Sequence, residues 1–212
     1  MDALELLRLN LLSPMVLAFA LGVLARLVKS DLAFPEAMYT ALSIYLLFAI
    51  GFKGGVELSK TPLLLLLLPA LATLFLGLFR PLLGYAVARR FLGVSRPDAG
   101  ALAAHYGSVS AVTFLAALTF AQAVGHRPEG FMPTLGALLE VPGIVLALLL
   151  AKRGGGDLGE ALREVLTGKS VVLLLGGLGI GALSGEAGME RVKPFFVDPF
   201  YGALTLFLMD LG

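Results

Sequence analysis

The chain has 212 residues, of which 58% are hydrophobic and 15% are charged, and its formal net charge is +1. So high an apolar share is typical of an all-α polytopic membrane protein, and so small a net charge gives no support to nucleic-acid binding. The sequence has no cysteine, which excludes disulfides, metal–thiolate sites and a thiol nucleophile.

Apolar segments follow one another along the chain, and we predict about seven membrane-spanning helices. Six of them begin with a polar or turn residue beside a Pro, which is tolerated at the first helical position because its missing N–H has no partner there. The predicted spans are residues 14–28, 35–51, 62–91, 97–124, 133–151, 169–183 and 199–212. The fourth span exceeds the roughly 20 residues of a simple crossing, so it has the length for two half-helices joined by a break.

The centre of the fourth span reads HYGSVSAVTFLAALT, residues 105–119, with Gly and Ser where a lipid-facing helix would carry Leu. Gly107 frees the backbone, and the hydroxyls of Ser108 and Ser110 can bond to backbone groups that a break leaves open. Irregular backbone survives in a membrane only where it is buried in protein or lines a wet cavity. We therefore predict a broken helix near the bilayer midplane that forms half of a small-ion site. The alternative is that these small residues only permit close helix packing.

The connections between the spans predict the orientation of the chain. The N-terminus and every second loop carry fewer Lys and Arg than the opposite set, which includes Arg89, Arg90 and Arg96. The positive-inside rule then places the N-terminus outside the cell and the longest loop, residues 153–168, in the cytoplasm. This loop contains a charged, helix-like segment, GEALREVL, and is either a docking surface for a soluble partner or a plain connector.

The last two spans resemble the first two. YTALSIYLLFAIGFKGG, residues 39–55, is similar to FYGALTLFLMDLG, residues 200–212, when Gly51 is aligned with Gly212, and LLLGGLGIGAL, residues 173–183, is similar to FALGVLARL, residues 19–27. An odd number of helices separates the copies, so equivalent helices cross in opposite directions, as in the inverted repeats of many transporters. We expect a first five-helix repeat in residues 1–152 and the incomplete start of a second in residues 169–212, in a chain that is C-terminally truncated.

Three blocks of sequence carry a resemblance to a known family. They are YGSVSAVTF at residues 106–114, EGFMPTLGALLEVPGIVLALLL at residues 129–150, and FVDPFYGALTLFLMDLG at residues 196–212. Together they resemble the SbtA family of sodium-dependent bicarbonate transporters. The resemblance implies a five-plus-five inverted-repeat fold of ten helices, a homotrimer in the plasma membrane, and sodium–bicarbonate symport by an elevator-type movement of a core domain against a gate domain. It also implies a PII-like regulator, SbtB, at the cytoplasmic face.

The resemblance also implies roles for residues of the predicted break. A bicarbonate site needs N–H donors, hydroxyls and the positive end of a helix dipole. We expect substrate binding by Gly107, Ser108, Val109, Ser110, Ala111 and Thr113. Sodium is the coupling ion and the only metal expected, with oxygen ligands from Ser108, Ser110, Thr113 and Glu140. Glu140 is a candidate because carboxylates inside a membrane are costly and commonly functional, although a role in helix packing would also explain it.

Other functions fit parts of the same pattern. A transporter of another small anion, or one coupled to protons, would use the same break, and a non-transporting membrane scaffold subunit would not need it. An intramembrane hydrolase would pair His105 with Ser108 or Ser110, but no third group that could orient the His is evident, so no enzyme activity is expected. Lys53 and Glu57 are expected at a solvated end of the second span.

Overall fold

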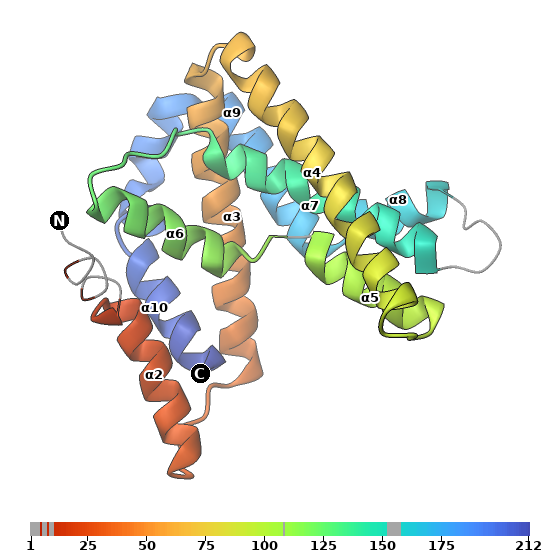
Figure 1. The fold of residues 1–212 in the computed structure, drawn as a ribbon. Helices are drawn as coiled ribbons and strands as arrows, with labels where there is room; N and C mark the ends of the chain where they lie inside the picture. Colours follow the sequence, from red (N-terminus) through yellow and green to blue (C-terminus); the bar gives the residue numbers. More distant parts are fainter. Residues whose placement is uncertain (1–4, 6–7, 9–10, 108, 152–157) are drawn as a thin grey trace.

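The computed structural model describes residues 5, 8, 11–107, 109–151 and 158–212, and every regular element in this part of the chain is an α-helix. Figure 1 shows their arrangement. The helices are α2 (Pro14–Leu27), α3 (Glu36–Lys60), α4 (Leu63–Arg90), α5 (Arg96–Gly107), α6 (Ala111–Ala123), α7 (Met132–Ala151), α8 (Leu158–Leu166), α9 (Lys169–Phe196) and α10 (Phe200–Leu211). The prediction of an all-α protein is confirmed.

Most helices begin close to the predicted positions, for the expected reasons. Ser13 caps α2: its hydroxyl accepts a hydrogen bond from the Val16 N–H at 3.4 Å, and Pro14 takes the first helical position. The helix-like segment predicted in the long loop is α8, and the fourth predicted span is divided into α5 and α6. These starts follow from local sequence because caps and prolines act within one turn.

One predicted helix end is wrong. The second span is expected to end at residue 51, but α3 continues to Lys60. Gly51, Gly54 and Gly55 do not terminate it, because they are buried against neighbouring helices and this packing offsets their low helix propensity. The sixth span is expected to end at residue 183, and its first helical part ends beside that residue, because Gly185 (φ 59°, ψ −157°) is not helical and makes a sharp turn. A second helical part follows the turn, and α9 ends at Phe196.

The helices pack in two groups (Figure 1). One group contains α2, α3, α9 and α10, and the other contains α4, α5 and α7. Met15, Leu46, Leu204 and Phe207 form a buried core in the first group. α7 joins the groups by packing against α3 and α9, and α8 packs on α7. Within the described part of the chain, α6 makes few contacts with other helices, although it follows directly on α5.

Two helix crossings in the first group are made by glycines at related positions. Where α2 crosses α10, a Cβ added to Gly22 would collide with the backbone oxygen of Met209. Where α3 crosses α9, a Cβ added to Gly177 would lie 2.8 Å from the backbone oxygen of Phe48. The alignment of Gly51 with Gly212 also makes Phe48 equivalent to Met209. The two contacts therefore correspond if Gly22 is equivalent to Gly177.

The reverse contacts give the same register. A Cβ on Gly51 of α3 would collide with the backbone oxygen of Leu174 in α9, and a Cβ on Gly212 would collide with that of Phe19 in α2. Phe19 precedes Gly22 by the same spacing that separates Leu174 from Gly177. One alignment of α2 with α9 and of α3 with α10 therefore relates both crossings.

The directions of these four helices follow from contacts at successive positions. α3 runs parallel to α9, α2 runs parallel to α10, and α3 runs antiparallel to α10. Consequently α2 and α9 run in opposite directions, as do α3 and α10. For α3 and α9 the pairs are Gly51 with Leu174 and Gly55 with Leu178. For α2 and α10 they are Met15 with Leu204 and Gly22 with Met209. For α3 and α10 they are Tyr39 with Phe207 and Tyr45 with Phe200.

Three of the described helices, α3, α4 and α9, are long and apolar enough to cross a membrane, and α2 and α10 are shorter apolar helices. α4 is the most exposed of the long helices: Leu63, Leu64 and Leu68 are 80%, 81% and 75% exposed. A continuous apolar surface of this kind is what a helix presents to lipid.

Candidate ion-binding site at a helix break

The predicted break is present. α5 ends at Gly107, α6 begins at Ala111, and Val109 and Ser110 between them are not helical, while Ser108 lies outside the described residues. α5 has 12 residues and α6 has 13, so each is about 18–20 Å long, short of the roughly 30 Å apolar core of a bilayer. Together they have the length of one crossing that is interrupted near its middle.

Ser110 starts α6 as its N-cap. Its backbone is extended (φ −69°, ψ 114°), and its hydroxyl oxygen accepts a hydrogen bond from the Thr113 N–H at 3.3 Å. The Thr113 hydroxyl donates to the same Ser110 oxygen at 3.1 Å. The cap thereby holds the first turn of α6, while the N–H groups of Ser110, Ala111 and Val112 have no acceptor within the helix.

The end of α5 is fixed by close backbone packing against α4 and α7. A Cβ added to Gly107 would lie 3.0 Å from Cα of Gly143 and 3.1 Å from Cγ of Pro81. A Cβ added to Gly143 would lie only 2.6 Å from the backbone oxygen of Gly107. All three residues are buried. This contact therefore determines where the carbonyl end of α5 lies on α7.

α7 places further oxygen atoms near this contact. Pro142 has no N–H, so the carbonyl of Leu138, four residues earlier, loses its usual helical donor. The carbonyls of the last turn of α5, which ends at Gly107, also lack donors within their helix. Glu140 lies on α7, about one turn before Gly143, and its side chain is outside the described part of the structure. The last turn of α5 and the turn of α7 before Gly143 therefore both carry carbonyls that lack a helical donor.

The two helix ends at the break have opposite polarity. The carbonyl end of α5 carries the negative end of a helix dipole and favours a cation, whereas the N–H end of α6 carries the positive end and favours an anion. Sodium takes oxygen ligands, and a small oxyanion takes donors such as the free N–H groups at the start of α6 and the Ser110 hydroxyl. The break thus offers groups suited to both kinds of ion, and none of the described residues from Gly107 to Thr113 carries a permanent positive charge.

The structure brings most of the predicted site residues together. Gly107, Val109, Ser110 and Thr113 lie at the break or within its first turn. Ala111 is the first residue of α6, and nothing of its side chain is described. Ion binding by these residues stays a prediction.

Sequence reasoning missed two contacts that shape the site. Pro81 and Gly143 pack against Gly107. Pro81 lies inside the apolar helix α4, and Gly143 directly follows Pro142 inside the apolar helix α7. That pattern was available as a signal, because Pro and Gly persist in membrane helices where a neighbouring backbone approaches closely. His105, by contrast, is bonded within α5: its Nδ1 lies 2.9 Å from the Ala101 carbonyl oxygen.

Long apolar helices, glycine-mediated crossings and a transmembrane-length segment broken at Gly and Ser define a polytopic α-helical membrane protein of the transporter type. A search among curated proteins found no match. The family model of the Na+-dependent bicarbonate transporter superfamily matches residues 14–212. The chain belongs to this superfamily, and the match supports its assignment to the SbtA family.

Proposed function

We propose that this protein imports bicarbonate together with sodium, as a symporter that works by elevator-type alternating access. The observation that carries the proposal is the break between α5 and α6, where a carbonyl-rich helix end and an N–H-rich helix end face one gap. Membership of the Na+-dependent bicarbonate transporter superfamily supports the choice of ions.

Bicarbonate is assigned to the N-terminal end of α6. The N–H groups of Val109, Ser110 and Ala111 and the hydroxyls of Ser108 and Ser110 would donate to its oxygens, with the positive end of the helix dipole behind them. The Thr113 hydroxyl would support them by donating to the Ser110 oxygen. A site of this kind contains no fixed cation. Binding is then strong enough for capture and weak enough for release, as transport requires.

Sodium is assigned to the oxygen-rich side of the same break. The carbonyls at the end of α5, the hydroxyls of Ser108, Ser110 and Thr113, and the carboxylate of Glu140 are the proposed ligands. Opposite unit charges 4 Å apart attract by about 4 kcal/mol at an effective dielectric constant of 20. Each ion would therefore raise the affinity of the site for the other, which is the thermodynamic basis of coupled transport.

We also infer the inverted repeat that the sequence predicts, with residues 1–152 as the first repeat, residues 153–168 as a connecting loop and residues 169–212 as the start of the second. The matched glycine crossings support this inference, because one alignment relates both and the equivalent helices run in opposite directions. Under this proposal the ion site has two halves, and α5 and α6 supply one of them.

The two helix groups suggest which parts move. α4, α5 and α7 hold the break and would form the core domain, while α2, α3, α9 and α10 would form the gate domain. Sliding would occur where α7 packs against α3 and α9. The close glycine crossings favour a rigid gate, because helices in backbone contact resist separation.

The remaining parts of the proposal concern the membrane and the partners. The protein would lie in the plasma membrane as a homotrimer, with its N-terminus outside and the loop of residues 153–168 in the cytoplasm. α8 would be the cytoplasmic element available to a PII-like regulator such as SbtB. Residues 152–157 of this loop lie outside the described part of the chain.

The test is Ser110→Ala in protein reconstituted into lipid vesicles. Sodium-driven uptake of radiolabelled bicarbonate is expected to be abolished, because the change removes a donor and the cap of α6, while loss of a cap costs only about 0.5–2 kcal/mol and leaves the fold intact. Ser43→Ala is the matched control, since the Ser43 hydroxyl bonds to the Tyr39 carbonyl of its own helix at 2.9 Å. Ser43→Ala is expected to transport normally.

Full uptake by Ser110→Ala would contradict the assignment. Uptake driven by a pH gradient in the absence of sodium would indicate the proton-coupled alternative, and uptake of another small anion in preference to bicarbonate would replace the substrate. A protein that expresses and folds but shows no ion-dependent flux or binding would favour the scaffold alternative.

A further inference from the structure

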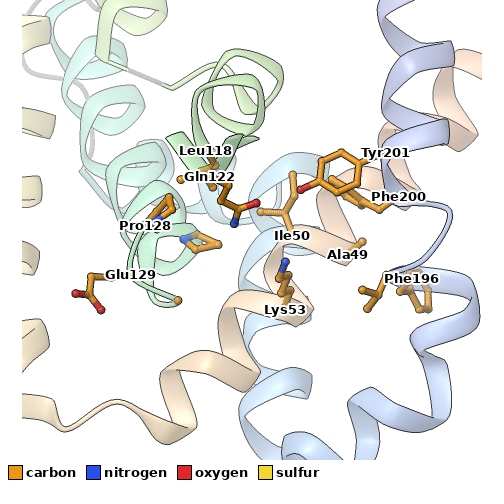
Figure 2. A pocket seen from close by; sticks show the side chains of 13 residues that line it. Ala49, Ile50, Lys53, Leu118, Gln122, Pro128, Glu129, Phe196, Phe200 and Tyr201 are labelled. Atoms are coloured by element: carbon orange, nitrogen blue, oxygen red, sulfur yellow. The ribbon is translucent and has the colours of Figure 1, made fainter. Parts of the chain in front are cut away.

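A cavity of about 120 Å³ lies outside the helix break, between α3, α6, the connection from α6 to α7 and the junction of α9 with α10. A space of roughly 10–15 Å³ already holds one water, so this cavity has room for a small hydrated ion. Its wall is mainly apolar, with Ile50, Leu118 and Phe200 among the lining residues. Figure 2 shows the polar side chains that enter it.

Lys53 is the charged donor of this cavity. It lies on α3 within a stretch whose other members, from Ala49 to Val56, are buried, yet Lys53 itself is exposed. No ion pair or hydrogen bond involves its ammonium group within the described part of the chain. Lys53 therefore brings an unpaired positive charge to a largely apolar cavity wall, while its exposure keeps the ammonium in contact with solvent.

The nearest acidic residue on the same helix is engaged elsewhere. Glu57, one turn after Lys53, lies 3.7 Å from the ammonium of Lys60. Lys60 in turn bonds to Glu186 of α9 at 2.8 Å. The ion pairs at this end of α3 are therefore formed around Lys60 and leave Lys53 available to a ligand.

Three donors converge in the cavity. Figure 2 shows the ammonium of Lys53, the side-chain amide of Gln122 on α6 and the hydroxyl of Tyr201 on α10 directed toward a common space. The carboxylate of Glu129, which also belongs to the lining, points away from them. One positive charge, one amide N–H₂ and one hydroxyl form the donor set that a small oxyanion requires.

This position is separate from the helix break. Leu118 and Gln122, which line the cavity, lie eight and twelve residues after Ser110, so about 12–18 Å of helix separates the cavity from the N-terminal end of α6. We propose that the cavity is a second anion site, in which Lys53, Gln122 and Tyr201 bind a bicarbonate-sized oxyanion before it reaches the break. The identity of the anion rests on the proposed function, whereas the binding of anions here does not.

The proposal is tested by the reactivity of a single introduced thiol, because the natural chain has no cysteine. The Gln122→Cys variant of the full chain is reconstituted in vesicles and labelled with one of two methanethiosulfonate reagents. One reagent carries an anionic sulfonatoethyl group, and the other carries a cationic trimethylammonioethyl group. Each reagent's rate is divided by its rate with a free thiol in solution. With Lys53 present, this normalised rate is expected to be about fivefold higher for the anionic reagent than for the cationic one, as one nearby charge in a wet site would produce. In Leu118→Cys, which keeps all three donors, bicarbonate is expected to slow labelling more than chloride at equal ionic strength.

Charge variants give the control. Lys53→Gln is expected to abolish the preference for the anionic reagent, and Lys60→Gln, which removes a cation from the same end of α3 but outside the cavity lining, is expected to preserve it. Leu118→Cys, also on the cavity side of α6, replaces Gln122→Cys if that variant does not fold.

Equal rates for the two reagents, a preference that survives Lys53→Gln, or a thiol that neither reagent reaches would overturn the second site. If the unaltered protein takes up no bicarbonate, that result would refute the proposed function and leave the second anion site standing. A preference for the anionic reagent that nitrate or acetate blocks but bicarbonate does not would keep the site and change its ligand.

Discussion

The contact between α5 and α7 gives the sharpest mutational prediction. In Gly143→Ala the new Cβ would lie 2.6 Å from the backbone oxygen of Gly107, 2.8 Å from its carbonyl carbon and 2.9 Å from its Cα. Carbon atoms in good contact are about 3.5–4.0 Å apart, so α5 must move away from α7 by at least about 0.6–0.7 Å. Neither partner can yield by rotating a side chain, because both sides of the contact are backbone.

The size of the effect follows from the packing of protein interiors. Forcing an extra carbon into a close contact typically costs about 1–3 kcal/mol, which corresponds to roughly 5- to 150-fold in an equilibrium constant. We expect this cost to appear in sodium binding, because Gly107 ends the helix whose carbonyls are the proposed ligands. Initial rates of bicarbonate uptake, measured against sodium concentration in vesicles, should show an apparent sodium affinity at least about fivefold weaker than in the unaltered protein.

Gly136→Ala provides the matched control on the same helix. Among the described residues, a Cβ at Gly136 would meet the ring of Phe114 alone, at 4.0 Å, which is ordinary contact. This change is expected to leave sodium affinity unaltered and to raise the stability of α7 slightly, because Ala favours a helix over Gly by up to about 1 kcal/mol. A Gly143→Ala protein with normal sodium affinity and full uptake would refute the link between this contact and the cation site.

Two further predictions concern glycines far from the break. Gly177→Ala should lower the melting temperature of the purified protein, because its Cβ would lie 2.8 Å from the backbone oxygen of Phe48. Gly176→Ala should leave the melting temperature unchanged or raised, because no atom of the described residues lies within 4 Å of its Cβ, and equal melting temperatures for the two variants would contradict the crossing. Gly185→Ala should destabilise by about 1–3 kcal/mol although the space around it is empty, because its φ of 59° with ψ of −157° suits glycine alone; thermal unfolding that matches the unaltered protein would show that the turn adapts.

Features that depend on a few neighbouring residues could be predicted from the sequence. The break at residues 107–111 is such a feature, since Gly and Ser disfavour a continuous helix and Ser110 can cap the segment that follows. The start of α2 at Ser13 and Pro14 is another, because a cap and a proline act within one turn.

Features that depend on a distant partner could not be predicted. Gly51 indicates the end of a helix when only its own segment is considered, but the backbone of Leu174 lies against it and α3 continues. Lys53 is exposed, as the sequence predicts, but it does not lie at a helix end, because α3 continues to Lys60. The environment of Lys53 is set by Gln122 and Tyr201, which are remote in sequence and reach the cavity from α6 and α10.

Two kinds of glycine contact explain how one chain could combine a rigid part with a moving part. In α3 and α9, glycines meet the partner backbone over successive turns, at Gly51 and Gly55 on one helix and at Gly177 and Gly181 on the other, so sliding would break several contacts together. At the break, the glycine contact fixes only one end of α5, at Gly107, and α6 has few neighbours among the described helices. The carbonyl end of the site is therefore held more firmly than the N–H end. It follows that the cation position should be the more sensitive to substitutions in α7, and the anion position to substitutions in α6 itself.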